Sequence, residues 1–296
     1  MPPPGSVVGA HRSAGVRGLP TLDRTLVMGV VNVTPDSFSD GGEWFDPADA
    51  VRHGMTALAH GVDVIDVGGE STRPGAIRPD VDEELRRVLP VISALASAGA
   101  VVSVDTMRSP VAVAAVDAGA RLINDVSGGQ ADPEMFDVVA ELGVPYVCMH
   151  WRGHSADMQS RASYRDVVTE VIHELQAQVA AALSAGIGAD SLIIDPGFGF
   201  AKTAEHNWQL LQRLDELEVL GLPLLVGLSR KAFLGALLSD ADGKVRPARE
   251  RDDASTALTT LCAARGVWGV RAHAVRATRD AVTVVQRLRR DGPPPR

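Results

Sequence analysis

Short apolar runs alternate along the chain with longer segments whose apolar positions recur every three or four residues. The short runs are typical of buried strands, and the longer segments are typical of helices packed on them. Strands are predicted at Leu26–Val33, Val62–Gly68, Val101–Thr106, Leu122–Val126, Tyr146–Trp151, Leu192–Pro196, Leu224–Ser229 and Val267–His273. Helices are predicted at Asp46–His60, Asp80–Ala98, Ser109–Ala118, Asp132–Leu142, Tyr164–Ala185, His206–Leu220, Arg251–Arg265 and Ala277–Arg290.

Strand and helix alternate eight times, which predicts a parallel sheet covered by helices and closed into a (β/α)8 TIM barrel. Glycines that can adopt left-handed caps follow six of the predicted helices, at Gly61, Gly119, Gly143, Gly186, Gly221 and Gly266. A doubly wound open sheet is the alternative, but the first strand lacks its glycine-rich turn. We expect a single domain over residues 21–291, with disordered ends at 1–20 and 292–296.

Composition narrows the class of protein. Hydrophobic residues make up 45% of the 296 residues and aromatic residues 4%, so aliphatic side chains must fill the core. The net charge of −8 argues against a nucleic-acid-binding protein. Cys148 and Cys262 lie in apolar runs and are expected to be buried thiols. No apolar run reaches the roughly 20 residues of a membrane span, so we expect a cytoplasmic protein without a membrane partner.

Polar side chains stand at the carboxyl end of every predicted strand. They are Asn32, Asp66, Asp105, Asn124, Asp125, His150, Asp195, Ser229, Arg230, Lys231, Arg271 and His273. In this fold the chemistry lies at that mouth, so we expect a polar ring around one cavity. The loops Thr34–Gly42 and Gly69–Ala76 exceed the usual length of a βα connection. We interpret them as two long βα lid loops rather than as plain solvated loops.

Six motifs occur in order and resemble those of the dihydropteroate synthase family. They are Met28–Gly42 (MGVVNVTPDSFSDGG), Asp66–Gly75 (DVGGESTRPG), Ser103–Thr106, Ile123–Asp125, Asp195–Phe200 and Gly227–Lys231. The resemblance covers roughly residues 24–290 and implies a pterin-binding barrel. The implied enzyme joins p-aminobenzoate to 6-hydroxymethyl-7,8-dihydropterin pyrophosphate, forming 7,8-dihydropteroate and pyrophosphate in folate biosynthesis.

The resemblance also implies roles for individual residues. The implied pterin-binding residues are Asp105, Asn124, Met149, Asp195, Phe200, Gly227 and Lys231. Those implied for pyrophosphate are Asn32, Thr72, Arg73, Arg271 and His273, with Asn32 as a ligand of Mg2+. Those implied for p-aminobenzoate are Phe38, Thr72, Arg73, Pro74 and Ser229, and the implied catalytic residues are Asp40, Arg73, Lys231, Arg271 and His273.

The implied mechanism is an SN1-like substitution, in which positioning and charge stabilisation supply the catalysis. The arylamine is neutral near pH 7, so no strong base is needed, and no Ser/His or Cys/His nucleophile is expected. A homodimer is implied by the resemblance alone.

Two features depart from the family pattern or fit none of its motifs. Ala274 stands where many relatives carry Asp, and the polar segment Arg152–Ser163 matches no motif. Two other functions remain open: a pterin-binding methyltransferase barrel and a catalytically silent pterin-binding paralogue. The first has no reason to keep Ser71–Pro74 or Ser229–Lys231, and the second would be expected to lose lid or pyrophosphate residues.

Overall fold

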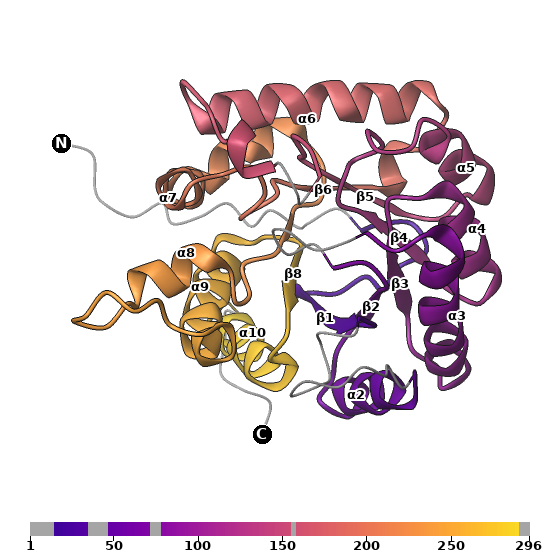
Figure 1. Ribbon diagram of the computed structural model, residues 1–296, viewed down its shortest axis with the longest axis horizontal. Helices are drawn as coiled ribbons and strands as arrows, with labels where there is room; N and C mark the ends of the chain where they lie inside the picture. The colour runs from indigo at the N-terminus through magenta and orange to yellow at the C-terminus, as the bar shows by residue number, and fades with distance from the viewer. Residues whose placement is uncertain (1–14, 35–46, 72–77, 155–157, 290–296) are drawn as a thin grey trace.

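The strands form one parallel sheet that is curved into a nearly closed barrel (Figure 1). The computed structural model describes residues 15–34, 47–71, 78–154 and 158–289. The strands are β1 (Leu26–Asn32), β2 (Val64–Gly68), β3 (Val102–Asp105), β4 (Leu122–Asp125), β5 (Tyr146–Met149), β6 (Leu192–Asp195), β7 (Leu225–Val226) and β8 (Gly269–Ala272). Their order is β6-β5-β4-β3-β2-β1-β8-β7, and a parallel bridge between Ile194 and Leu224 joins β6 to β7. The predicted (β/α)8 barrel is confirmed.

Helices lie on the outside of the strands (Figure 1). They are α2 (Pro47–Ala59), α3 (Val81–Ser97), α4 (Ser109–Asp117), α5 (Met135–Leu142), α6 (Val167–Ser184), α7 (Ala204–Gln212), α8 (Ala232–Leu237), α9 (Asp252–Arg265) and α10 (Val275–Arg289). Asp80 caps α3 by accepting a 2.8 Å hydrogen bond from Glu83 N. All six glycines predicted to follow helices have positive φ angles, between 65° and 111°. Those glycines therefore end the helices as the sequence predicts.

Two helical segments differ from the prediction. The single helix expected over 206–220 is α7 followed by a 3-10 helix, Leu214–Leu220. Leu214, Leu217 and Leu220 are three residues apart, which suits the three-residue turn of that helix, and the first two are buried. The short helix α8 was not predicted because its six residues are too few to show a helical period.

The inside of the barrel is filled by apolar residues from the amino-terminal halves of the strands. Leu26, Met28, Val64, Leu122, Val147, Ile193 and Leu225 form one buried cluster there. Val16, Leu19 and Trp268 belong to the same cluster, so residues 15–20 close this end of the barrel. Val16 is 4% exposed and Leu19 8%, so within the described residues 15–20 the chain is packed on the barrel, where the sequence predicts disorder. Among the described residues, no helix is long and apolar enough to cross a membrane.

Candidate active site

Alternation along the strands brings the predicted site residues to the barrel interior. Successive strand residues point to opposite faces, so the residue two positions after an inward apolar residue also points inward. Leu122 is followed in this way by Asn124, and Ile193 by Asp195. Val147 is likewise followed by Met149, and Leu225 by Gly227. The apolar layer therefore lies directly beneath the polar mouth.

A single cavity of about 1170 Å³ occupies this mouth. Its lining includes every predicted site residue that the structure describes: Asn32, Asp105, Asn124, Met149, Asp195, Phe200, Gly227, Ser229, Lys231, Arg271 and His273. The other predicted residues, Phe38, Asp40, Thr72, Arg73 and Pro74, and most of both predicted lids, fall outside the described residues. The cavity is large enough to bury two small organic molecules side by side.

Arg271 is held by two carboxylates deep in the cavity. Its guanidinium donates to Asp66 Oδ2 at 2.6 Å and to Asp105 Oδ2 at 2.8 Å. Asp66 Oδ2 also accepts from Asn124 Nδ2 at 2.9 Å. Burial raises the pKa of Asp105 to about 8, and the Arg271 charge opposes that shift. Burial lowers the pKa of Arg271, but the two carboxylates outweigh it and raise the pKa overall.

Asp66 is a site residue to which the sequence reasoning gave no role. It is fully buried, and its Oδ1 atom has no hydrogen-bond partner in the structure. Its place in β2, two residues after Val64 and on the same strand face, was the available signal. Asp66 therefore joins the Arg271 cation to the Asn124 amide.

On the other side of the cavity, Asp195 faces Lys231. Asp195 Oδ1 accepts a 2.7 Å hydrogen bond from Gly197 N, so this carboxylate also stabilises the turn after β6. Burial raises the pKa of Asp195, whereas the Gly197 N–H and the Lys231 charge oppose that shift. Lys231 Nζ lies 4.2 Å from the centre of the Phe200 ring, which is a cation–π contact. A Cβ atom on Gly227 would stand 3.8 Å from Asp195 Oδ2, so glycine keeps this wall open.

Ser229 and His273 form a hydrogen-bonded pair at the rim. Ser229 Oγ accepts the backbone N–H of His273 at 3.1 Å and lies 3.0 Å from His273 Nδ1. Burial lowers the pKa of His273 to about 3, and nearby arginines lower it further, so the ring is neutral at pH 7. With Nδ1 accepting from the serine hydroxyl, the ring proton is on Nε2. Ser229 and His273 are thus hydrogen-bonded, but so weakly basic a histidine is a poor base for a nucleophile, so the pair does not contradict the expectation that no Ser/His nucleophile is used.

A separate set of contacts holds the turn that carries Lys231. Arg230 has a positive φ of 61°, which is unusual for a residue with a side chain. Its guanidinium makes a bidentate pair with Asp252, with both bonds at 2.7 Å. Arg251 donates to the carbonyl oxygens of Arg230 and Lys231 at 2.9 and 3.3 Å. These contacts hold the strained turn in place.

Three members of the expected polar ring do not line the cavity: Asp66 points inward but is covered, and Asp125 and His150 point away. Asp125 and His150 follow inward residues by one position, so they point to the outer layer. Asp125 accepts from Tyr146 Oη at 2.7 Å, and His150 contacts Glu174 and Lys202. Both are fully buried. Only the inward-pointing residues therefore form the polar ring, and the prediction that Asp125 and His150 belong to it is wrong.

The sequence matches the model of the pterin binding enzyme family over residues 28–273. It is 55% identical over 274 residues to a dihydropteroate synthase from Mycobacterium leprae, covering 92% of this chain and 96% of that protein. It is 44% identical to the dihydropteroate synthase of Escherichia coli K12, covering 90% of this chain and 92% of that protein.

Solved structures agree with these matches. A dihydropteroate synthase from Xanthomonas albilineans with 4-aminobenzoic acid matches with a TM-score of 0.86 and 46% identity, covering 95% of this chain and 100% of that one. The structure of that enzyme in complex with 7,8-dihydropteroate matches with a TM-score of 0.82 and 44% identity, covering 93% and 98%. The chain therefore belongs to the pterin binding enzyme family, as one of its dihydropteroate synthases, which are transferases.

Proposed function

We propose that the cavity at the mouth of the barrel is where the dihydropterin pyrophosphate and p-aminobenzoate react, and that its lining residues take the roles implied by the family motifs. One observation carries this proposal: all the predicted site residues within the described ranges line one cavity. They come from seven strands or the loops that follow them, so nothing but the fold brings them together.

The pterin ring fits the inner half of the cavity. Asp195 accepts from the N3–H and 2-amino donors of the pterin, and Lys231 donates to its 4-oxo and N5 side. Asn124 can both donate and accept, which suits the mixed edge near N1. Met149 and Phe200 supply apolar walls, and Met149 is only 3% exposed. Asp105 faces the N8 side while it remains paired with Arg271.

The pyrophosphate lies along the wall that carries Asn32, Arg271 and His273. The neutral His273 ring donates through Nε2, and Arg271 supplies positive charge in a chain of net charge −8. Mg2+ fits this donor set, because it prefers oxygen ligands and usually binds substrate phosphates with only one or two protein groups. The described residues contain no cluster of three His, Cys, Asp or Glu that would bind a metal without substrate. When bound through Asn32, Mg2+ neutralises charge on the leaving pyrophosphate.

The reaction proceeds as an SN1-like substitution in this proposal. The C–O bond between the pterin CH2 group and pyrophosphate breaks first, and the bonding pair leaves with pyrophosphate. The electron-rich dihydropterin spreads the positive charge, and the p-aminobenzoate nitrogen then forms the new C–N bond and loses a proton. Ser229 borders the p-aminobenzoate position and at the same time fixes the tautomer of His273. Asp40, on the first predicted lid, is the candidate to stabilise the cation.

The test is a pyrophosphate-release assay with Mg2+ and both substrates. Wild-type protein is expected to release pyrophosphate only when p-aminobenzoate is present. Lys231→Ala is expected to weaken binding of the dihydropterin substrate by about tenfold to a hundredfold, because a charged hydrogen-bond donor is lost. Lys244→Ala, which removes an exposed lysine, is the matched control. Unchanged affinity in Lys231→Ala would show that the pterin lies elsewhere.

We further propose that the enzyme works as a homodimer in the cytoplasm. The support is the resemblance to dihydropteroate synthases. Light scattering after size-exclusion chromatography should give twice the chain mass of 31.2 kDa. A mass of one chain at micromolar concentration would contradict the dimer.

A further inference from the structure

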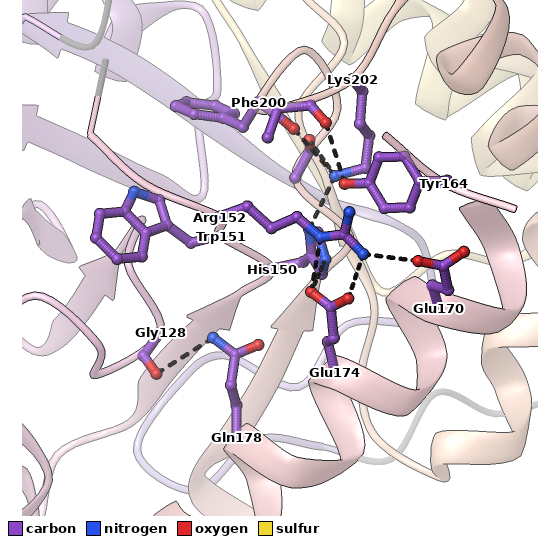
Figure 2. A network of polar contacts seen from close by, with 12 residues as sticks. Gly128, His150, Trp151, Arg152, Tyr164, Glu170, Glu174, Gln178, Phe200 and Lys202 are labelled. Atoms are coloured by element: carbon purple, nitrogen blue, oxygen red, sulfur yellow. Dashed lines mark hydrogen bonds and ion pairs between the residues drawn. The ribbon is translucent and has the colours of Figure 1, made fainter. Parts of the chain in front are cut away.

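A cluster of polar side chains lies next to Phe200, and its central residue also lines the cavity (Figure 2). Its centre is Lys202, which is only 3% exposed. Lys202 Nζ lies 2.9 Å from His150 Nδ1, 3.0 Å from the Gly197 carbonyl oxygen and 3.2 Å from the Phe200 carbonyl oxygen. Burial lowers the pKa of Lys202 to about 7, and the Asp195 charge opposes that shift. In its ammonium form Lys202 has three N–H donors, and each one has an acceptor within the protein. Lys202 therefore binds two points of the loop 197–201, at the carbonyl oxygens of Gly197 and Phe200.

His150 and Glu174 hold Lys202 from behind. His150 Nε2 lies 3.0 Å from Glu174 Oε2, on α6. Burial lowers the pKa of His150 to about 4, so the ring is neutral at pH 7. The neutral ring can donate from Nε2 to Glu174 and accept at Nδ1 from Lys202. A continuous chain of hydrogen bonds therefore runs from Glu174 on α6 through His150 and Lys202 to the loop.

Arg152 extends the cluster to a second point of the same loop. It donates to both carboxylate oxygens of Glu174 and lies 3.8 Å from the centre of the Tyr164 ring. Tyr164 Oη donates in turn to the Ala201 carbonyl oxygen at 3.0 Å. Figure 2 shows Arg152 and His150 both pointing toward Glu174, with Lys202 on the opposite side of His150. Arg152, in the segment that matched no motif, thus acquires a structural role.

The loop needs this support because its backbone is unusual. Gly197, Gly199 and Ala201 have positive φ angles of 68°, 78° and 46°, and the last of these residues carries a side chain. A residue with a Cβ atom is disfavoured in that region, so the surroundings must hold it there. A Cβ atom on Gly199 would also stand 3.0 Å from Lys231 Cδ. The loop is therefore pressed closely against Lys231.

We propose that Lys202 is a positioning residue of the pterin site. Its hydrogen bonds hold the loop 197–201 in the conformation that sets Phe200 against Lys231, and His150 and Glu174 hold Lys202 in place. Lys202 lines the cavity, but its Nζ contacts are all to protein acceptors, so we assign its effect to the loop rather than to direct contact with the substrate. This inference rests on the pterin pocket proposed above.

Lys202→Met tests the proposal, because it keeps the length of the side chain and removes the donors. Lys244→Met, at an exposed lysine, is the matched control. Amide hydrogen exchange of residues 197–201 in the substrate-free protein is expected to rise at least about tenfold, since the bonds that fix the loop are lost. The KM for the dihydropterin substrate is expected to rise about tenfold or more, with a smaller change in kcat. Unchanged exchange in a folded variant would overturn the proposal.

Glu174→Gln gives a milder second variant and decides the question if Lys202→Met does not fold. It removes the negative charge behind His150 and keeps the shape of the side chain. Exchange in 197–201 and the KM for the dihydropterin substrate should both rise, by less than in Lys202→Met. A loop that loosens while that KM stays unchanged would refute the positioning role. Because exchange is measured without substrate, it reports on the loop even if Lys231→Ala disproves the pocket.

Discussion

Lys231 occupies the position where small changes in protonation should matter most for pterin binding. Burial lowers its pKa to about 8, Asp195 and Asp105 oppose that shift, and Arg271 adds to it. The lowered pKa means that the ammonium form dominates below about pH 8 and is lost above it. A donor with a positive charge binds the 4-oxo oxygen more strongly than a neutral amine does.

The affinity for the dihydropterin substrate should therefore fall as pH rises through about 8. The measurement is a series of binding titrations by calorimetry between pH 6.5 and 9.5, expressed as the slope of log affinity against pH. Lys231→Arg keeps the charge across that range, so its slope should be close to zero. An equal slope in Lys231→Arg would assign the titration to another group, and Asp105 is the first candidate because burial raises its pKa to about 8.

At the scale of single elements, the turn between β7 and α8 depends on a neighbouring helix. Arg230 has a positive φ, and its bidentate partner Asp252 is the first residue of α9. Both side chains of this pair are less than one-third exposed, at 27% and 30%. The pair is therefore better protected from solvent than an ordinary surface ion pair.

Asp252→Asn should lower kcat/KM by about threefold to tenfold, because it weakens the pair that holds Ser229 and Lys231 in register. Asp253→Asn, at the adjacent exposed position of the same helix, should have almost no effect. Steady-state kinetics with both substrates provide the measurement. Equal losses in the two variants would point to the charge of α9 rather than to the turn.

The helices and strands also show which parts of the fold could be predicted from the sequence and which could not. Most of the long helices and the six capping glycines follow from a 3.6-residue period and from backbone sterics, and they were predicted correctly, the segment 206–220 excepted. The strand predicted at Leu224–Ser229 is present as the two-residue β7, whereas the six residues of α8 are too few to show a period and were not predicted. Strand alternation, applied strictly, would have separated Asn124 from Asp125 and Met149 from His150. The role of Lys202 depends on contacts between distant elements, which no local pattern reveals.

At the scale of the whole molecule, the two ends of the barrel have different roles: one carries the site and the other contributes stability. The carboxyl ends of the strands carry the polar cavity, and the amino ends carry the apolar cluster that Val16, Leu19 and Trp268 close. Leu122 and Ile193, which belong to this cluster, lie directly beneath the polar mouth, and Leu19 lies at its opposite end. Changes at the closed end should therefore alter stability without altering catalysis.

Leu19→Ala provides the test of that separation. Leu19 is 8% exposed and packs into the cluster at the closed end, so its truncation leaves a cavity and should lower the free energy of unfolding by about 2 kcal/mol. Urea unfolding followed by Trp fluorescence measures that loss, and kcat and KM at a temperature well below unfolding should match wild type. Leu288→Ala, at a leucine that is 80% exposed, should change neither quantity. A fall in kcat for Leu19→Ala under those conditions would mean that the closed end and the cavity are mechanically coupled through the apolar cluster that fills the barrel.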